Sequence, residues 1–429
     1  MSRISFQNNH ELNHVKSYLL FLIGQVQSQL GSIIVQFVII LWITLEYQST
    51  FYLGLASFVG FAPMVIATLF TGVLVDRYNR KAIIIIVDSL QALVTLLLVY
   101  LFWTEMVTIV HILLILAARA FLQAFHMPAT EAIVPLMVPK DKLSRINGLR
   151  QFSDGVSGVI GPVLAVFLLN YWEIRLILLL DPLTFILAIF PVLFIDIPSP
   201  KKKTEKRENI SFKAEFSEGI FFIVNKPGLL PLVLLFSVLN FLFNPLFVLL
   251  PMFIIQTHAK GKDEIAFMMV LLQIGYVSGS ILMMVWKGFK RKIFGAMLAM
   301  VGIFIGMLII TIVPPNTEYF NVIGIGFSIV GLTLVILNTT ILTLYHSVIP
   351  PEKLGQFTAV RRTVIWFTIP VSSLLSGIIA EFLDIRLIFF SCIVLGLIAV
   401  VYSWLMTKLP DLEHSLTKPS TDAVSSIPN

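Results

Sequence analysis

The sequence predicts an all-α integral membrane protein with twelve transmembrane helices, and three observations support this. Hydrophobic residues fill 57% of the 429 positions and charged residues only 13%, whereas a soluble domain carries about 25% charged residues. The mean hydropathy is +0.93. Apolar stretches of about 20 residues, long enough to cross a bilayer, recur along almost the whole chain. These stretches must be helices, because a bilayer offers no partner to unpaired backbone groups.

Turns that are polar or basic separate twelve apolar segments, which define the expected spans. The first segment is long and lacks a small-residue cleavage site, so it should remain as a span rather than be removed as a signal peptide. The expected spans are residues 18–44, 50–75, 81–103, 105–127, 145–170, 173–196, 228–256, 264–286, 291–313, 318–346, 354–382 and 384–408.

Lysine and arginine gather in alternate loops, at residues 77–81, 140–150, 201–226, 287–292 and 353–362. The opposite loops carry only Arg175, Lys260, Lys262 and Arg386. Basic loops are retained on the cytoplasmic side, so both termini are predicted to be cytoplasmic. The net charge of +6 therefore reflects topology and does not indicate a nucleic-acid partner.

The chain is predicted to consist of two six-helix bundles. The expected parts are a cytoplasmic N-terminal tail (1–17), a first bundle (18–196), a basic cytoplasmic linker (197–227), a second bundle (228–408) and a disordered tail (409–429). Phe212, Phe216, Ile220 and Ile223 are spaced as on one face of a helix, which predicts an amphipathic helix on the membrane surface within the linker.

A weak internal repeat supports the division into two bundles. The run VPKDKL at 138–143 recurs as IPPEKL at 349–354, and WEIRLI at 172–177 recurs as LDIRLI at 383–388. Both pairs are 211 residues apart (349 − 138 and 383 − 172). A shared offset at separate places indicates duplicated units of the parallel type.

A charged turn joins the second and third expected spans. Arg77, Arg80 and Lys81 should hold it on the cytoplasmic side. Asp76 can pair with those arginines or meet the positive N-terminal end of a neighbouring helix. Such a latch would form in one arrangement of the helices and break in another.

The whole turn, GVLVDRYNRK at 72–81, resembles the loop 2–3 signature of the major facilitator superfamily. The resemblance implies the major facilitator fold, in which two six-helix bundles rock around a central site. It also places Gly72 with Asp76, Arg77 and Arg80 in the latch. Asn79 stands where the family usually has glycine, and asparagine is expected to tolerate a left-handed backbone there.

Ionisable residues inside spans are costly to bury and are functional candidates, and four of them stand out. They are Asp88, Arg119, Asp154 and Asp181. Counted from the cytoplasmic ends, the first three should lie about 10 to 14 Å deep and meet at one level. We expect Arg119 and Asp154, assisted by Asp88 or Asp181, to form a proton-responsive network. The alternative is a static ion pair that fixes helix packing, with Asp181 capping a kink at Pro182.

Two further motifs resemble superfamily signatures. Arg119, followed by Gln123 and Ala124, is similar to the span 4 motif, which implies proton coupling. The run GVSGVIGP at 155–162 resembles the span 5 motif of exporters, which assigns Gly158, Gly161 and Pro162 to it. Close helix packing is the alternative explanation of those small residues. The first half of the chain resembles the macrolide-efflux and siderophore-exporter branch of the superfamily.

Polar side chains within apolar helices are the candidates for a substrate cavity. They are Gln25, Gln29, Gln36, Asn240, Asn244, Gln273 and Asn338. The first three share one helix face, as do the two asparagines of span 7. No metal-ligand spacing and no nucleotide-binding loop occur in the sequence, so no cofactor is expected and an ion gradient is the natural energy source.

The sequence as a whole predicts a monomeric secondary transporter of the bacterial cytoplasmic membrane, and no enzyme. It is expected to export an amphiphilic organic compound, such as a macrolide-like drug or a siderophore, in exchange for protons. A lipid or lysophospholipid flippase and an uptake facilitator are alternatives of the same fold. A membrane-embedded enzyme or a sensor is a remote alternative, because the chain shows no cluster of nucleophile and base and no soluble sensing domain.

Overall fold

The computed structural model describes residues 2–139, 142–195, 212–286, 288–315, 319–410 and 412, and the side chains of these residues except 2–14, 72–74, 76–77, 144, 212–215 and 351–352. Within this part of the chain, twelve helical segments are long and apolar enough to cross a membrane. The predicted fold class is confirmed.

Most of the helices that the structure describes follow one another with short connections. The second span consists of α2 and the start of α3, and the sixth consists of α7 and α8. The helices of the first half are α1 (Ser2–Tyr47), α2 (Thr50–Val59), α3 (Ala62–Arg77), α4 (Arg80–Trp103), α5 (Ile109–Met137), α6 (Leu143–Tyr171), α7 (Ile174–Leu178) and α8 (Leu180–Phe194). The later ones are α9 (Phe212–Asn225), α10 (Leu229–Met252) with a π-helical turn (Phe253–Thr257), α11 (Lys262–Val285), α12 (Lys292–Ile312), α13 (Phe320–Val348), α14 (Pro351–Ala380) and α15 (Ile385–Met406).

The contacts divide the chain into two compact units. Unit 1 contains Met1–Glu205 together with Val248–Val270 and Ser373–Phe382, so parts of α10, α11 and α14 belong to it. Unit 2 contains Lys206–Phe247, Leu271–Ser372 and Leu383–Asn429. Residues 197–211 of the predicted linker lie outside the described residues, and the division into two six-helix bundles stays a prediction.

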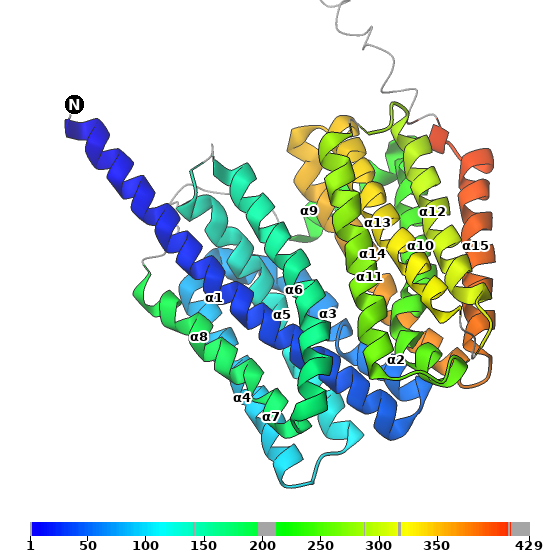
Figure 1. Cartoon of the computed structure of the whole chain (residues 1–429). Helices are drawn as coiled ribbons and strands as arrows, with labels where there is room; N and C mark the ends of the chain where they lie inside the picture. The colour runs from blue at the N-terminus through cyan, green and yellow to red at the C-terminus, as the bar shows by residue number, and fades with distance from the viewer. Residues whose placement is uncertain are drawn as a thin grey trace, which may run out of the picture. The chain divides into compact units, whose positions relative to one another are not determined.

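Helix α1 packs closely on α8 because two glycines face it. A Cβ added at Gly24 would lie 3.2 Å from the Cα of Ala188, and one at Gly31 would collide with the side chain of Thr184. The glycines are seven residues apart and so share a face of α1. Figure 1 shows α1 as a long blue helix with α8 beside it. This approach brings the middle of α1 next to Asp181 on α8.

The end of α14 packs on α2 inside unit 1. A Cβ at Gly54 would lie 2.6 Å from the carbonyl oxygen of Ser373 and 2.7 Å from the Cα of Gly377. One at Gly377 would lie 2.7 Å from the Cα of Gly54 and from the carbonyl oxygen of Thr50. The two backbones therefore touch at a pair of facing glycines.

Two local expectations were wrong. Span 4 was expected to end at residue 127, yet α5 continues to Met137 with Pro128 and Pro135 inside it, since neighbouring helices satisfy the backbone groups that a proline frees. Asn79 was expected to adopt a left-handed backbone, but its φ is −67°. Its side chain instead caps α4 by accepting from the N–H groups of Lys81 at 2.9 Å and Ala82 at 3.3 Å, the usual role of asparagine there.

Two segments that flank the predicted spans are helical. Helix α1 begins at Ser2, inside the predicted tail. The predicted amphipathic helix is α9, whose Ile223 is buried and whose Gly219 lies against Gln356 and Val360 of α14. Whether α9 rests on a membrane surface stays a prediction.

Candidate functional site

Asp181 on α8 is the centre of a buried polar network in unit 1. Its side chain is fully buried. Ser32 of α1 donates a hydrogen bond to Oδ1 at 2.8 Å, and Thr95 of α4 donates one to Oδ2 at 2.8 Å. The guanidinium of Arg119 on α5 contacts the same Oδ2 and also the hydroxyl of Thr95. One carboxylate thus joins four helices and is paired with a cation that is 11% exposed.

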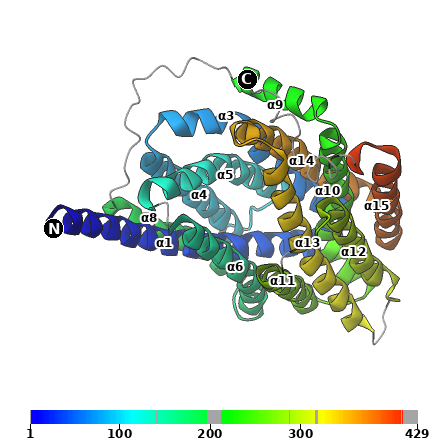
Figure 2. The same cartoon turned by 90° about the horizontal axis from the view of Figure 1, so that it is seen from above.

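The network continues along the seam between α4 and α5. Thr95, Gln91 and Asp88 share a face of α4, and the antiparallel α5 presents polar side chains opposite them. Nε2 of Gln91 donates to Oε1 of Gln123 at 3.2 Å. We call this set of six residues the polar ladder: Asp88, Gln91 and Thr95 on α4, and Arg119, Gln123 and His126 on α5. The two helices lie side by side in Figure 2.

The third rung of the ladder pairs Asp88 with His126. Nε2 of His126 lies 3.1 Å from Oδ1 of Asp88, and the two side chains are 16% and 0% exposed. The distance is that of an ion pair, but the angles are not those of a hydrogen bond, and both oxygens of Asp88 lack a hydrogen-bond partner among the described residues. We regard the pair as a close but poorly aligned contact.

The corresponding helices of the second half, α12 and α13, pack without any such ladder. The offset of 211 residues places Ala299, Gly302 and Gly306 where α4 has Asp88, Gln91 and Thr95, and places Val330, Leu334 and Leu337 where α5 has Arg119, Gln123 and His126. A Cβ at Gly306 would lie 2.7 Å from Cγ2 of Val330, and one at Gly302 2.6 Å from Cγ2 of Thr333. The helix pair therefore packs well with small and apolar residues, and the polar ladder is an addition in the first half.

The structure combines the four predicted ionisable residues differently from what was expected. Arg119 pairs with Asp181 and does not contact Asp154, which is exposed on α6. The prediction assumed that Arg119 lay nine residues from the end of its span, but α5 continues for eighteen residues beyond it (137 − 119). Arg119 is therefore level with Asp181 and not with Asp88, which pairs with His126 instead.

The basic turn ties neighbouring helices of unit 1 together. Nη1 of Arg80 donates to the carbonyl oxygen of Ala132 on α5 at 3.2 Å. Nζ of Lys81 donates to the carbonyl oxygens of Leu193 at 2.9 Å and Ile195 at 2.8 Å. Lys81 thus caps the C-terminal end of α8, where a cation is favoured, and sequence reasoning had not assigned this role. The side chains of Gly72, Asp76 and Arg77 lie outside the described residues, so the latch stays a prediction.

The exporter-type motif lies within the continuous helix α6, which contains Pro162. A Cβ at Gly161 would collide with Ile33 of α1. Gly161 therefore permits close packing between α6 and α1, which is the structural explanation of the motif. Gly158 is half-buried, and an exporter role for the motif stays a prediction.

The predicted cavity residues fall into different units. Gln25, Gln29 and Gln36 are half-buried on α1 in unit 1, and Nε2 of Gln25 is buried without a described partner. In unit 2, Asn240 donates to the carbonyl oxygen of Phe236 at 2.9 Å on its own helix, and Asn244 donates to that of Ile369 on α14 at 3.2 Å. Gln273 is half-buried and Asn338 is exposed. The substrate cavity stays a prediction.

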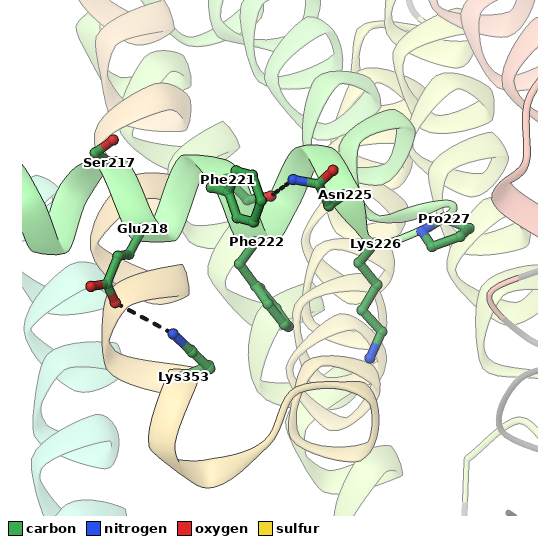
Figure 3. A pocket seen from close by; sticks show the side chains of 8 residues that line it. All are labelled: Ser217, Glu218, Phe221, Phe222, Asn225, Lys226, Pro227 and Lys353. Atoms are coloured by element: carbon green, nitrogen blue, oxygen red, sulfur yellow. Dashed lines mark hydrogen bonds and ion pairs between the residues drawn. The ribbon is translucent and has the colours of Figure 1, made fainter. Parts of the chain in front are cut away.

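A pocket of about 590 Å³ lies between α9 and the start of α14 in unit 2. Figure 3 shows Glu218 reaching Lys353, with Nζ and Oε2 3.4 Å apart, and Lys226 beside Phe222. Nζ of Lys226 donates to the carbonyl oxygen of Val348 at 2.5 Å, and burial lowers the pKa of this lysine. Lys226 and Lys353 both have partners in the structure. The docking of α9 on α14 therefore accounts for the pocket.

Among the described residues, no group of three or more His, Cys, Asp or Glu side chains is placed to hold a metal ion. What the arrangement provides is one buried carboxylate, Asp181, whose hydrogen bonds and ion pair join four helices.

Comparisons with known proteins agree with this architecture. Macrolide efflux protein A of Streptococcus pyogenes is 27% identical over 361 residues, 83% of this chain and 88% of that protein. The staphyloferrin A transporter of Staphylococcus aureus is 25% identical over 175 residues, 40% of this chain and 42% of that protein. The crystal structure of a nucleoside transporter has a TM-score of 0.70 at 11% identity, covering 94% of this chain and 100% of that one.

A family model described as Major Facilitator Superfamily matches residues 21–369 and 261–428. These matches cover most of the chain, including α4, α5 and α8, which carry the Asp181 network. The protein is a multi-pass membrane transporter and not an enzyme, and it belongs to the Major Facilitator Superfamily.

Proposed function

We propose that the protein exports an amphiphilic organic compound, of the macrolide or siderophore class, in exchange for protons. The observation that carries this proposal is the burial of Asp181 among hydrogen-bonding partners on three other helices. The likeness to macrolide efflux protein A and to the staphyloferrin A transporter supports the substrate class. The basic loops support a cytoplasmic location for both termini.

In the proposed mechanism Asp181 is the group that carries the proton. When it is ionised, it accepts from Ser32 and Thr95 and pairs with Arg119. When it is protonated, the ion pair is lost and Thr95 can donate its single hydroxyl proton to the carbonyl oxygen of Gln91, 3.1 Å away. The two protonation states thus hold α1, α4, α5 and α8 by different contacts. Coupling requires that proton and substrate bind the two states of the transporter with different affinities.

Transport in inside-out vesicles of known protein content tests the proposal. A radiolabelled macrolide should accumulate when the vesicle lumen is acidic, and an ionophore that collapses the pH gradient should abolish the accumulation. Asp181→Asn should lose the dependence on the gradient, because an amide cannot carry the proton. The same assay on Asp154→Asn shows whether this exposed carboxylate has the role that the sequence suggested.

Equal accumulation with and without the pH gradient would reject proton antiport. A siderophore arm, with the strain starved of iron and secreted chelator measured, distinguishes the two substrate classes. Movement of a fluorescent phospholipid between leaflets, with no macrolide or siderophore transport, would instead support the flippase alternative.

A further inference from the structure

Asp88 and His126 are a buried titratable pair next to the Asp181 network, and the mechanism above does not use them. Asp88 has no exposed surface, and Nε2 of His126 is 3.1 Å from its Oδ1. Neither oxygen of Asp88, nor Nε2 of His126, has another hydrogen-bond partner among the described residues. A buried carboxylate in this state is costly unless a proton or a cation compensates it.

The side chains around this pair supply no other compensating charge among those that the structure describes. None of the described titratable side chains on the packed helices forms a salt bridge or hydrogen bond with either member. These are Lys16, Tyr18, Glu46 and Tyr47 on α1, Tyr52 on α2, Arg80, Lys81 and Tyr100 on α4, His111, Arg119 and Glu131 on α5, Arg175 on α7, and Asp181 on α8, while the side chains of Asp76 and Arg77 on α3 lie outside the described residues.

The pair is also not needed to pack the two helices. The equivalent positions in the second half are the uncharged Ala299 and Leu337, and the α12–α13 seam is closely packed at Gly302 and Gly306. The polar ladder connects Asp88 to Thr95, which donates a hydrogen bond to Asp181. Asp88 and Thr95 are seven residues apart on one face of α4, about 10 Å along the helix. The hydrogen-bonded side chains of Gln91 and Gln123 lie between them. The pair therefore lies on the same polar seam as the proposed proton carrier, nearer to the basic loops.

We propose that Asp88 and His126 form a second proton-binding site, from which the proton bound at Asp181 passes on toward the basic-loop end of unit 1. The site binds one proton: the imidazole gains it to become an imidazolium, which faces the carboxylate of Asp88, and loses it again to become neutral. The pair has no net charge with the proton and carries one negative charge without it. This inference rests on the proposed function, because the proton that passes is the coupled ion.

Nuclear magnetic resonance of the full-length protein in nanodiscs, labelled with ¹⁵N histidine, measures the protonation of His126 directly. His126→Gln identifies its signal by removing it. His111→Gln is the matched control, because His111 is on the same helix but lies in its first turn, with Nδ1 3.0 Å from the hydroxyl of Thr108, which caps α5. We expect the His126 signal to titrate, and its midpoint to move by at least one pH unit in Asp88→Asn and not at all in His111→Gln. If Asp88→Asn does not fold, Asp88→Glu, which moves the carboxylate by one methylene, must also shift the midpoint.

A midpoint that Asp88 variants leave unchanged, or a histidine signal that does not titrate, would overturn the proposed site. Transport then separates this inference from the proposed function. Gradient-driven macrolide accumulation should fall at least tenfold in both Asp88→Asn and His126→Gln, and should be unchanged in His111→Gln. If both variants keep full coupling while Asp181→Asn loses it, the second site is rejected and the proposed function stands. If wild-type accumulation ignores the gradient, the proposed function fails, while the titration still decides whether the pair binds a proton.

Discussion

Glu381, just after α14, accepts a hydrogen bond at 2.8 Å from the backbone N–H of Phe51 in the first turn of α2. The hydroxyl groups of Ser49 and Thr50 donate to the same oxygen at 2.6 and 3.2 Å. The carboxylate thus occupies the positive N-terminal end of α2, where an anion is favoured. The hydrogen bond from Ser49, and next that from Phe51, lower the pKa of Glu381. Two segments of unit 1 that are far apart in sequence are tied at this point.

We predict that Glu381→Gln weakens this tie by about 0.5–1 kcal/mol, a small value because Glu381 is exposed to solvent. Because the contact lowers the pKa of Glu381, the stabilisation that the contact provides is fully present above the ordinary glutamate pKa of about 4.3. This stabilisation is lost only as the pH falls through the lowered value. The effect of the substitution should therefore be the same at about pH 6 and about pH 8.

The distance between spin labels attached at Glu46→Cys and Ile379→Cys reports whether this tie is formed. Cys392→Ser removes the native thiol. The wild-type background should give one short distance, and Glu381→Gln should add a longer one. Glu105→Gln, an exposed glutamate elsewhere, is the control. A distance distribution that changes between pH 6 and 8 would show that Glu381 itself titrates in this range, against the prediction.

The glycine contact next to this tie should be intolerant of a methyl group. Gly54→Ala and Gly377→Ala each place a Cβ within 2.7 Å of backbone atoms, which cannot move as a side chain can. We expect each to destabilise the protein by about 1–3 kcal/mol, seen as a lower melting temperature in detergent. Gly155→Ala is the matched control, because a Cβ there meets nothing within 4 Å. Equal melting temperatures for all three variants would contradict the close contact.

The Asp181 and Arg119 substitutions should be strongly non-additive in stability. Asp181→Leu leaves the guanidinium buried without its counter-ion, which typically costs about 3–5 kcal/mol. Replacing both residues by leucine removes both charges, and the second half has the uncharged Cys392 and Val330 at the equivalent positions, 211 residues further along. The double variant should therefore be more stable than Asp181→Leu alone. Thermal unfolding of the four proteins in one detergent gives the interaction energy, and additive losses would mean that the pair does not act as a unit.

The docking of α9 on α14 should depend on Gly219 more than on the surface charges. A Cβ at Gly219 would lie 2.7 Å from Cγ2 of Val360 and 2.8 Å from the carbonyl oxygen of Gln356. We expect Gly219→Leu to speed hydrogen exchange of the α9 amides at least tenfold. Ser217→Ala, on the exposed side, should leave exchange unchanged, and Glu218→Gln should have a small effect because its pair with Lys353 is solvent-exposed. Unchanged exchange in Gly219→Leu would show that α9 is held by other contacts.

Sequence reasoning identified most residues of the site, but not which of them pair with one another. Burial cost alone identified Asp88, Arg119 and Asp181 as unusual, because a charged side chain in an apolar span needs a partner. The partners depend on helix register. An error of ten residues at the end of span 4, which α5 extends to Met137, placed Arg119 opposite Asp154 rather than Asp181. His126 was not among the predicted site residues, and it lies one residue before the expected end of the span at residue 127.

The sequence by itself determined that this chain is a membrane protein of twelve helices and where those helices run, because the cost of exposing backbone and charge to a bilayer leaves no other solution for such apolar segments. It also determined which side chains are too costly to be incidental. Only the tertiary structure decided that α4 and α5 meet with Asp88 opposite His126 and Thr95 opposite Arg119, and that Asp181 joins them from α8. Those pairings depend on relative rotation and register, which are set by contacts such as Gly24 on Ala188 between helices that are distant in the sequence.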